Sequence, residues 1–113
     1  MSKFNSLKKN REFKNVYNLK NYVSDENFFL YIKKNDFDNS RIGISISKKV
    51  GNSVVRHKYI RKIREIFRLN QKIIKNNYDI IINCKKNITN STYEDLNKSF
   101  LKLCKKKEIL MEQ

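Results

Sequence analysis

The sequence predicts a small α+β sandwich, in which helices pack on a sheet of about four strands in the order αβββαβα. Two kinds of pattern predict it. In some stretches apolar and other residues alternate, as on a half-buried strand, and in others the apolar residues recur every three or four positions, as on a helix. The 113 residues contain no proline, no Gly/Ser-rich linker and no internal repeat, so we expect one domain spanning residues 1–113.

The individual elements can be placed along the chain. In order, we expect a helix over Leu7–Tyr17, a short strand over Asn21–Ser24, strands over Asn27–Lys34 and Arg41–Ser47, a helix from Asn52 to about Ile74, a strand over Tyr78–Cys84 and a final helix. Asn52 follows Gly51 and is a favourable N-cap, so the long helix should begin there. The motif STYE at Ser91–Glu94 reads as a capping box that starts the final helix.

The charge of the chain narrows the class of partner. Lys and Arg outnumber Asp and Glu by 26 to 11, which gives a formal net charge of +15 at pH 7 and predicts a polyanionic partner. Charge alone does not separate RNA, DNA and an anionic membrane. No apolar run approaches the roughly 20 residues of a spanning helix, and the first residues lack the apolar region of a signal peptide. A membrane is therefore the weakest of the three, and we expect a cytoplasmic protein.

The cysteine and histidine content argues against a metal site. Cys84 and Cys104 are the only cysteines and His57 is the only histidine, so a zinc site of the usual ligand count cannot be built. Both cysteines fall within apolar patterns, and we expect them to be core residues.

The helix predicted from Asn52 has two contrasting faces. On a helical wheel the apolar face comprises Val55, Tyr59, Ile63, Ile66 and Phe67, and the opposite face comprises His57, Arg61, Arg64 and Arg68. Four of the six arginines of the chain lie in this helix, and Glu65 is the nearby counter-charge. A row of arginines at one-turn spacing spans several phosphates, and the guanidinium fork suits them, so nucleic acid is favoured over an ordinary solvated face.

A second group of residues is aromatic. Phe29 and Tyr31 share one strand face, and Ser45 and Ser47 share the corresponding face of the next strand, with Gly43. This face is either a stacking platform for single-stranded nucleic acid or a second small core covered by the first helix. The sequence leaves both interpretations open.

A catalytic site borne by the protein is not evident. Asp36 and Asp38 lie in NDFDNS, which reads as a turn, and His57 has no evident base partner. A nuclease acting through its own side chains would need clustered carboxylates or paired histidines.

The stretch SKKVGNSVVRHKYIRKIRE at Ser47–Glu65 resembles the protein subunit of bacterial ribonuclease P. That family has a strand, a Ser-Lys-Lys sequence, a Gly-Asn pair and then a helix with an Arg-Asn-Arg motif. LKKNREFKNVY at Leu7–Tyr17 is similar to the first helix of the family, and FFLY and RIGISIS match its strands. The resemblance covers nearly the whole chain in the right order.

The resemblance implies a function and separate roles for an RNA subunit and a protein subunit. The enzyme is an endoribonuclease that removes the 5′ leader of precursor tRNA, and its RNA subunit holds the catalytic Mg²⁺ ions, so no catalytic side chain and no tightly bound metal are expected in the protein. The implied leader-binding cleft comprises Phe13, Tyr17, Phe29, Tyr31, Ser45, Arg56, Arg61 and Arg64. The implied contacts with the RNA subunit and with phosphate comprise Lys48, Lys49, Arg56, His57, Lys58, Arg61, Lys62, Arg64 and Arg68. No DNA partner and no membrane partner are expected.

Some positions depart from the family pattern. The Arg-Asn-Arg motif is Arg56-His57-Lys58 here, a commonly basic position is Ile60, and Tyr17 stands where phenylalanine is usual. The family also implies a left-handed strand–helix–strand crossover, against the general right-handed preference. The alternatives are a structural RNA-binding protein of ribosomal type and a DNA-binding module that places its long helix in the major groove.

Overall fold

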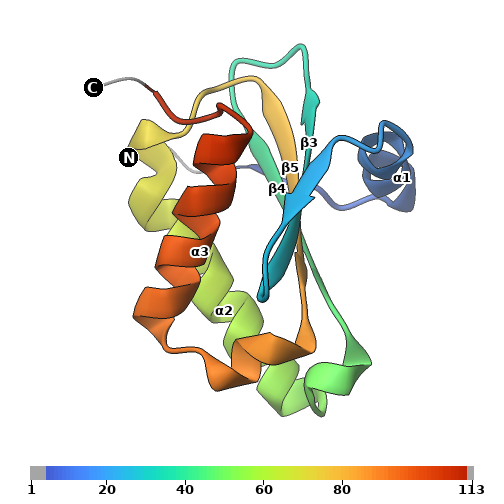
Figure 1. Ribbon diagram of the computed structural model, residues 1–113. Coiled ribbons are helices and arrows are strands. Elements are labelled where there is room, and N and C mark those ends of the chain that lie inside the picture. The colour runs from blue at the N-terminus through green and yellow to red at the C-terminus, as the bar shows by residue number, and fades with distance from the viewer. Residues whose placement is uncertain (1–4, 112–113) are drawn as a thin grey trace.

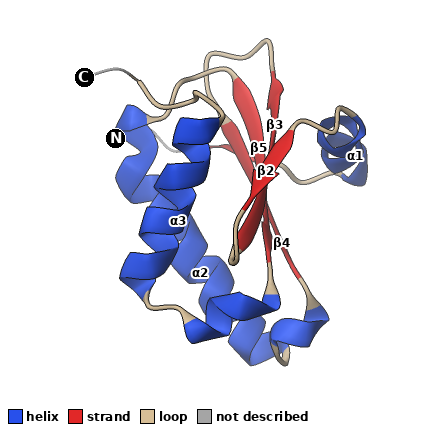
Figure 2. Cartoon of the chain, viewed as in Figure 1, coloured by secondary structure: helices blue, strands red, loops and turns tan. Residues whose placement is uncertain are grey.

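The computed structural model describes residues 5–111, and it shows a layered α+β fold (Figure 1). The elements are β1 (Asn5–Ser6), α1 (Asn10–Asn18), β2 (Tyr22–Ser24), β3 (Phe28–Lys34), β4 (Arg41–Ile46), η1 (Lys48–Val50), α2 (Ser53–Asn70), η2 (Gln71–Ile73), β5 (Tyr78–Cys84), η3 (Lys86–Asn90) and α3 (Tyr93–Lys106). Helices α2 and α3 lie on one side of the sheet and α1 lies on the other (Figure 2). The predicted class and the order αβββαβα are confirmed.

The sheet has the strand order β1-β4-β5-β3-β2. Strands β3 and β5 are antiparallel, as are β2 and β3, whereas β4 and β5 are parallel neighbours joined through α2. The four predicted strands are β2 to β5, and the two-residue β1, which pairs with β4 in parallel, is an addition. The left-handed sense of the crossover stays an expectation from the resemblance.

The main core lies between the sheet and the pair α2 and α3. Phe28, Leu30 and Ile32 point into it from β3, as the strand alternation predicts. The helices contribute the buried side chains of Ile63, Ile66, Phe67, Leu96, Phe100 and Leu103, so the apolar face expected for the long helix is confirmed. Val55 and Tyr59 are half-buried at the edge of this core.

The two cysteines belong to the same core. Cys84 and Cys104 are buried and unpaired, and burial raises the pKa of each thiol to about 12. Their predicted role as core residues is confirmed.

A second, smaller core holds α1 on the opposite side of the sheet. Leu7, Val16 and Ile81 are buried there, and Phe13, Tyr17 and Tyr31 pack against them. Helix α1 begins at Asn10, so the start predicted at Leu7 is wrong. Leu7 instead follows β1, and its backbone N–H donates to the Ile42 carbonyl at 2.8 Å.

Two further boundaries differ from the prediction. The α-helix α2 ends at Asn70, and a 3-10 turn, η2, continues to Ile73. The capping box of α3 uses Thr92 and Asp95 rather than Ser91 and Glu94: the Thr92 hydroxyl accepts from the Asp95 N–H, and the Asp95 carboxylate accepts from the Thr92 N–H, both at 3.1 Å. Ser91 is one residue too early, and its hydroxyl donates to the Asn27 side chain.

The predicted N-cap of α2 is confirmed. The Asn52 side-chain oxygen accepts from the Val55 N–H at 3.0 Å. Between β4 and this cap the chain makes a 3-10 turn, η1, which the Ser47 side chain caps by accepting from the Lys49 N–H. The sequence pattern did not predict this turn.

Candidate nucleic-acid interface

The strand register builds two rows of side chains on the sheet face that carries α1. The first row is Tyr22, Tyr31, Ile81 and Gly43, and the second is Ser24, Phe29, Asn83 and Ser45. Each row crosses β2, β3, β5 and β4 in turn. The two rows have different surroundings, because α1 is too short to cover both.

The first row is largely covered by α1. Val16 is fully buried against Ile81, and the Tyr17 ring meets the Tyr31 ring edge to face, with 4.8 Å between centroids. Gly43 allows this close approach, since a Cβ there would lie 2.7 Å from Cζ of Phe13. This half of the face is therefore a second core, one of the two interpretations that the sequence left open.

The second row is open and forms the floor of a hollow. The hollow measures about 400 Å³ and is lined by Phe29, Ser45, Ile46, Ser47, Asn83, Cys84, Lys85 and Lys86. We call these eight residues the aromatic groove. It lies where β4 and β5 end, and this half of the face has the open surface that the stacking-platform interpretation requires.

Three aromatic rings form a continuous cluster at the edge of the groove. The Tyr22 ring lies 5.0 Å from that of Tyr31 and 6.0 Å from that of Phe29, and Tyr22 is 47% exposed. Sequence reasoning did not single out Tyr22. The short strand predicted over Asn21–Ser24 includes Tyr22, but the sequence does not show which residues this strand faces. The β2–β3 register places the Tyr22 side chain beside Phe29 and Tyr31.

Asn83 is a second residue that sequence reasoning missed. The Tyr17 hydroxyl donates to Asn83 Oδ1 at 2.8 Å, which links α1 to the floor of the groove. Burial raises the pKa of Tyr17, while its hydrogen bonds with Asn83 and Ser45 oppose the shift. Tyr17 is therefore a hydrogen-bond donor throughout the physiological pH range.

Lys85 lies over one ring of the groove. Its Nζ is 4.2 Å from the Phe29 centroid, a cation–π distance, and it donates to the Asp25 carbonyl at 2.6 Å. The carboxylate of Asp25 accepts from the N–H groups of Asn27 and Phe28 at 2.9 and 3.0 Å, and also from the Ser99 hydroxyl. Burial opposes ionisation of Asp25, but these hydrogen bonds outweigh it and lower its pKa. The β2–β3 turn is thus fixed, and with it the position of Lys85.

Helix α2, which carries the basic row, lies on the other side of the sheet from α1 (Figure 1), whereas the floor of the groove belongs to the α1 face. His57, Arg61, Arg64 and Arg68 are exposed, and so is Lys58. Arg68 is ion-paired with Glu65, with 3.2 Å between its Nε and Glu65 Oε2, and the pair lowers the pKa of Glu65. Lys62 is half-buried, and its Nζ lies 5.2 Å from the Tyr59 centroid.

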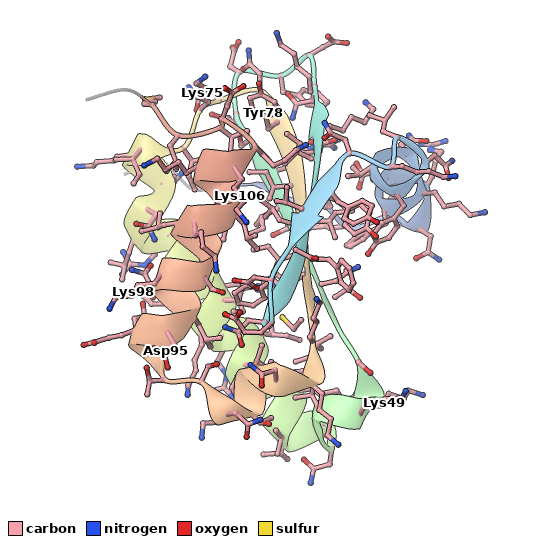
Figure 3. All side chains as sticks on the ribbon, in the orientation of Figure 1. Lys49, Lys75, Tyr78, Asp95, Lys98 and Lys106 are labelled. Carbon is pink, nitrogen blue, oxygen red and sulfur yellow. The ribbon has the colours of Figure 1, made fainter. Side chains whose placement is uncertain are left out.

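Further basic residues gather at the end of the molecule where β4 finishes. Lys48 and Lys49 are exposed in η1, and Figure 3 shows Lys49 projecting from this end, opposite Lys75. Arg56 is half-buried in the first turns of α2, and its Nε is buried with no hydrogen-bond partner among residues 5–111.

The predicted site residues therefore divide between two surfaces. Phe29 and Ser45 line the aromatic groove, while Phe13, Tyr17 and Tyr31 form the adjoining α1 contact. The arginines predicted to line or flank the cleft, namely Arg56, Arg61 and Arg64, lie on α2 and are not among the residues that line the groove.

Residues 5–111 contain no group of three or more His, Cys, Asp or Glu side chains that could hold a metal ion. No helix within that range is long and apolar enough to cross a membrane.

The fold and its surfaces define a small, strongly basic α+β protein with an aromatic groove on one layer and an arginine row on the other. A sequence model of the Ribonuclease P family matches residues 1–108. The chain is 37% identical over 110 residues to the ribonuclease P protein component of Alkaliphilus metalliredigens, covering 97% of this chain and 99% of that one. It is 41% identical over 110 residues to that of Fusobacterium nucleatum, covering 94% and 99%. The structure of the Staphylococcus aureus RNase P protein matches with a TM-score of 0.86 and 32% identity, covering 95% and 98%.

The chain belongs to the ribonuclease P protein family. The resemblance inferred from Ser47–Glu65 and the strands is confirmed, and the chain is a protein component of a ribonucleoprotein that processes tRNA.

Proposed function

We propose that this protein binds the single-stranded 5′ leader of precursor tRNA in the aromatic groove and binds the ribonuclease P RNA through its basic residues. It thereby assists the Mg²⁺-dependent endonucleolytic removal of the leader in the cytoplasm. The observation that carries the proposal is the open row of Phe29, Asn83 and Ser45 beside three clustered aromatic rings.

The groove suits an unpaired strand of varied sequence. Every base has a π-face, so stacking on Phe29, Tyr22 and Tyr31 tolerates any base and contributes roughly 1–3 kcal/mol for each. Lys85 and Lys86 line the same hollow and supply positive charge for the backbone. A duplex would not expose its base faces to these rings.

The α2 surface suits the phosphates of a folded RNA. Arg61 and Arg64 are exposed, and in the described part of the chain neither forms an ion pair, so their charge is available to phosphate. Lys48 and Lys49 lie at the end of the sheet where the groove also lies, so they are placed to contact RNA near the leader. Arg56 is half-buried and adds a positive charge in the first turns of α2. His57, Lys58, Lys62 and Arg68 complete the proposed contacts with the RNA subunit.

We assign no step of the cleavage chemistry to a side chain of this protein. The carboxylates that the structure describes are dispersed or engaged, as Glu12 and Asp79 are with Arg41. In this proposal the Mg²⁺ ions are held mainly by the RNA subunit, and the protein contributes affinity for the leader and neutralises phosphate charge.

The decisive experiment is cleavage of a leader-bearing precursor tRNA at low Mg²⁺ with a bacterial ribonuclease P RNA alone, the protein alone, and both together. We expect cleavage at the mature 5′ end only when both are present, because the protein replaces charge neutralisation that the RNA alone obtains from high Mg²⁺. If the protein binds the RNA tightly and adds nothing to cleavage, a structural role of ribosomal type is the better assignment.

A further inference from the structure

We propose that Asn83 makes the groove select a leader base whose major-groove edge carries a carbonyl group, guanine (O6) or uracil (O4), over one whose same edge carries an amino group, adenine (N6) or cytosine (N4). The inference rests on the proposed leader-binding function and specifies what that site prefers. It concerns the polar floor of the groove, whereas stacking on the aromatic rings is indifferent to the base.

Asn83 occupies the centre of the open row. On β5 it pairs in register with Phe29 on β3 and with Ser45 on β4, so a base stacked beside Phe29 presents its edge to the Asn83 amide. Residues 29 and 83 are each half-buried and Ser45 is exposed, so the row is accessible but shielded enough for hydrogen bonds to discriminate.

A hydrogen bond from α1 sets the orientation of the Asn83 amide. The Tyr17 hydroxyl donates to Asn83 Oδ1 at 2.8 Å, and the Tyr17 ring is itself held edge to face by Tyr31. With the carbonyl engaged, the NH₂ group is the end left for a ligand. Nδ2 has no partner among the described residues and is not a buried unpaired atom, so it reaches the solvent of the hollow.

A second donor lies beside the amide, whereas the Ser45 hydroxyl can donate or accept and so favours neither kind of base. Lys85 lines the same hollow, and an ammonium group donates hydrogen bonds but cannot accept them. Guanine presents two adjacent acceptors, O6 and N7, and uracil presents O4, all of which match these donors. On the same edge the amino groups of adenine and cytosine would face the Asn83 N–H, so the hydrogen bond that O6 or O4 accepts would be lost, while N7 is an acceptor common to both purines.

The test uses the assembled holoenzyme and precursor tRNAs in which each leader nucleotide in turn is A, C, G or U. Relative kcat/KM values are measured by internal competition at low Mg²⁺, and the base preference of the RNA subunit alone, measured at high Mg²⁺, is divided out. At one leader position we expect G and U to be favoured over A and C by about three- to tenfold, the value of one hydrogen bond.

Two variants assign the preference to this amide. Asn83→Asp replaces the donor with an acceptor, so on this edge the order should invert to favour the amino groups of A and C. Tyr17→Phe keeps the ring but releases Oδ1, so the amide can turn either way and the preference should fall below twofold. Asn76→Asp adds the same charge at an exposed position before the other end of β5 and should leave the base order as it is in the unmodified protein.

The outcomes separate this inference from the function on which it rests. Equal rates for the four bases at every position, with leader-bearing substrate still preferred over leaderless tRNA, would overturn the role of Asn83 and leave the proposed function intact. An unchanged order in Asn83→Asp would do the same. Loss of any dependence on the leader in the unmodified protein would overturn both.

Discussion

Arg41 holds Asp79 in a two-pronged ion pair, with Nε 2.8 Å from Oδ1 and Nη2 2.7 Å from Oδ2. Asp79 is 2% exposed, and its Oδ1 also accepts from the Asn35 side chain at 2.8 Å. The third nitrogen of Arg41, Nη1, reaches Glu12 on α1 at 2.6 Å. One guanidinium therefore connects α1 to β5, the strand that carries Asn83.

We expect Asp79→Asn to lower the free energy of unfolding by about 3 kcal/mol, because it breaks the more buried of the two ion pairs of Arg41 and leaves Glu12 as its charged partner. Urea denaturation followed by circular dichroism measures the change. Asp38→Asn is the control, since Asp38 is exposed in the β3–β4 connection. Equal losses in the two variants would show that the Asp79 ion pair contributes nothing particular.

The Glu12 carboxylate should make stability depend on acid pH. Its pKa is lowered from 4.5 to about 2, chiefly by hydrogen bonds from the N–H groups of Lys9 and Lys8, with the Arg41 charge adding to them. A carboxylate with a lowered pKa stabilises the fold fully above about pH 4.5, and this contribution is lost as the pH falls toward 2. Glu12→Gln should lower the free energy of unfolding by about 1 kcal/mol at pH 7 and flatten its decline between these pH values. An identical pH profile in the variant would contradict the assignment.

Tyr22 should contribute to leader binding although the sequence did not reveal it. Replacing it with leucine keeps an apolar side chain but removes the ring, so we expect the affinity for leader-bearing precursor tRNA to fall by about 1–2 kcal/mol. Fluorescence titration of the holoenzyme with leader-bearing and leaderless tRNA measures the difference between the two. The control is Phe37→Leu, since Phe37 is 52% exposed but lies in the β3–β4 connection, away from the groove. A loss that is the same for leaderless tRNA would place Tyr22 outside the leader site.

The arginine row should contribute to the salt dependence of binding to the RNA subunit. Arg61→Ala and Arg64→Ala should each reduce the slope of log K against log salt by about 0.7 to 0.9, the value of one phosphate contact. Arg68→Ala should change it less, because Glu65 already neutralises that arginine. Conversely, Glu65→Gln should steepen the slope by releasing Arg68. Unchanged slopes in the Arg61 and Arg64 variants would remove this row from the RNA interface.

The sheet and the helices could be predicted because their patterns are local. Alternation along β3 assigns Phe28 and Phe29 to opposite faces, and the spacing of Leu96 and Phe100 marks the buried side of α3. The buried positions of both sets agree with the structure.

The polar centre of the site could not be predicted, for a physical reason. Asn83 matters because β5 lies between β3 and β4 in the sheet and because the Tyr17 hydroxyl reaches it from α1, 66 residues earlier in the chain. Both facts depend on how distant segments pair, which no local pattern records. Asn83 followed three isoleucines and read only as the end of a buried strand.

The split of the surface into two layers has a genetic consequence. The floor of the groove belongs to the sheet face that carries α1, and the arginine row belongs to α2 on the other side of the sheet (Figure 1), so a substitution on one surface need not disturb the other. Selection imposed by the leader sequences of a genome can remodel the floor around Asn83, while selection imposed by the RNA subunit acts on α2. Each surface can therefore change in sequence together with its own partner. Exchanging α2 between relatives should transfer the preference for an RNA subunit without changing the preference for a leader.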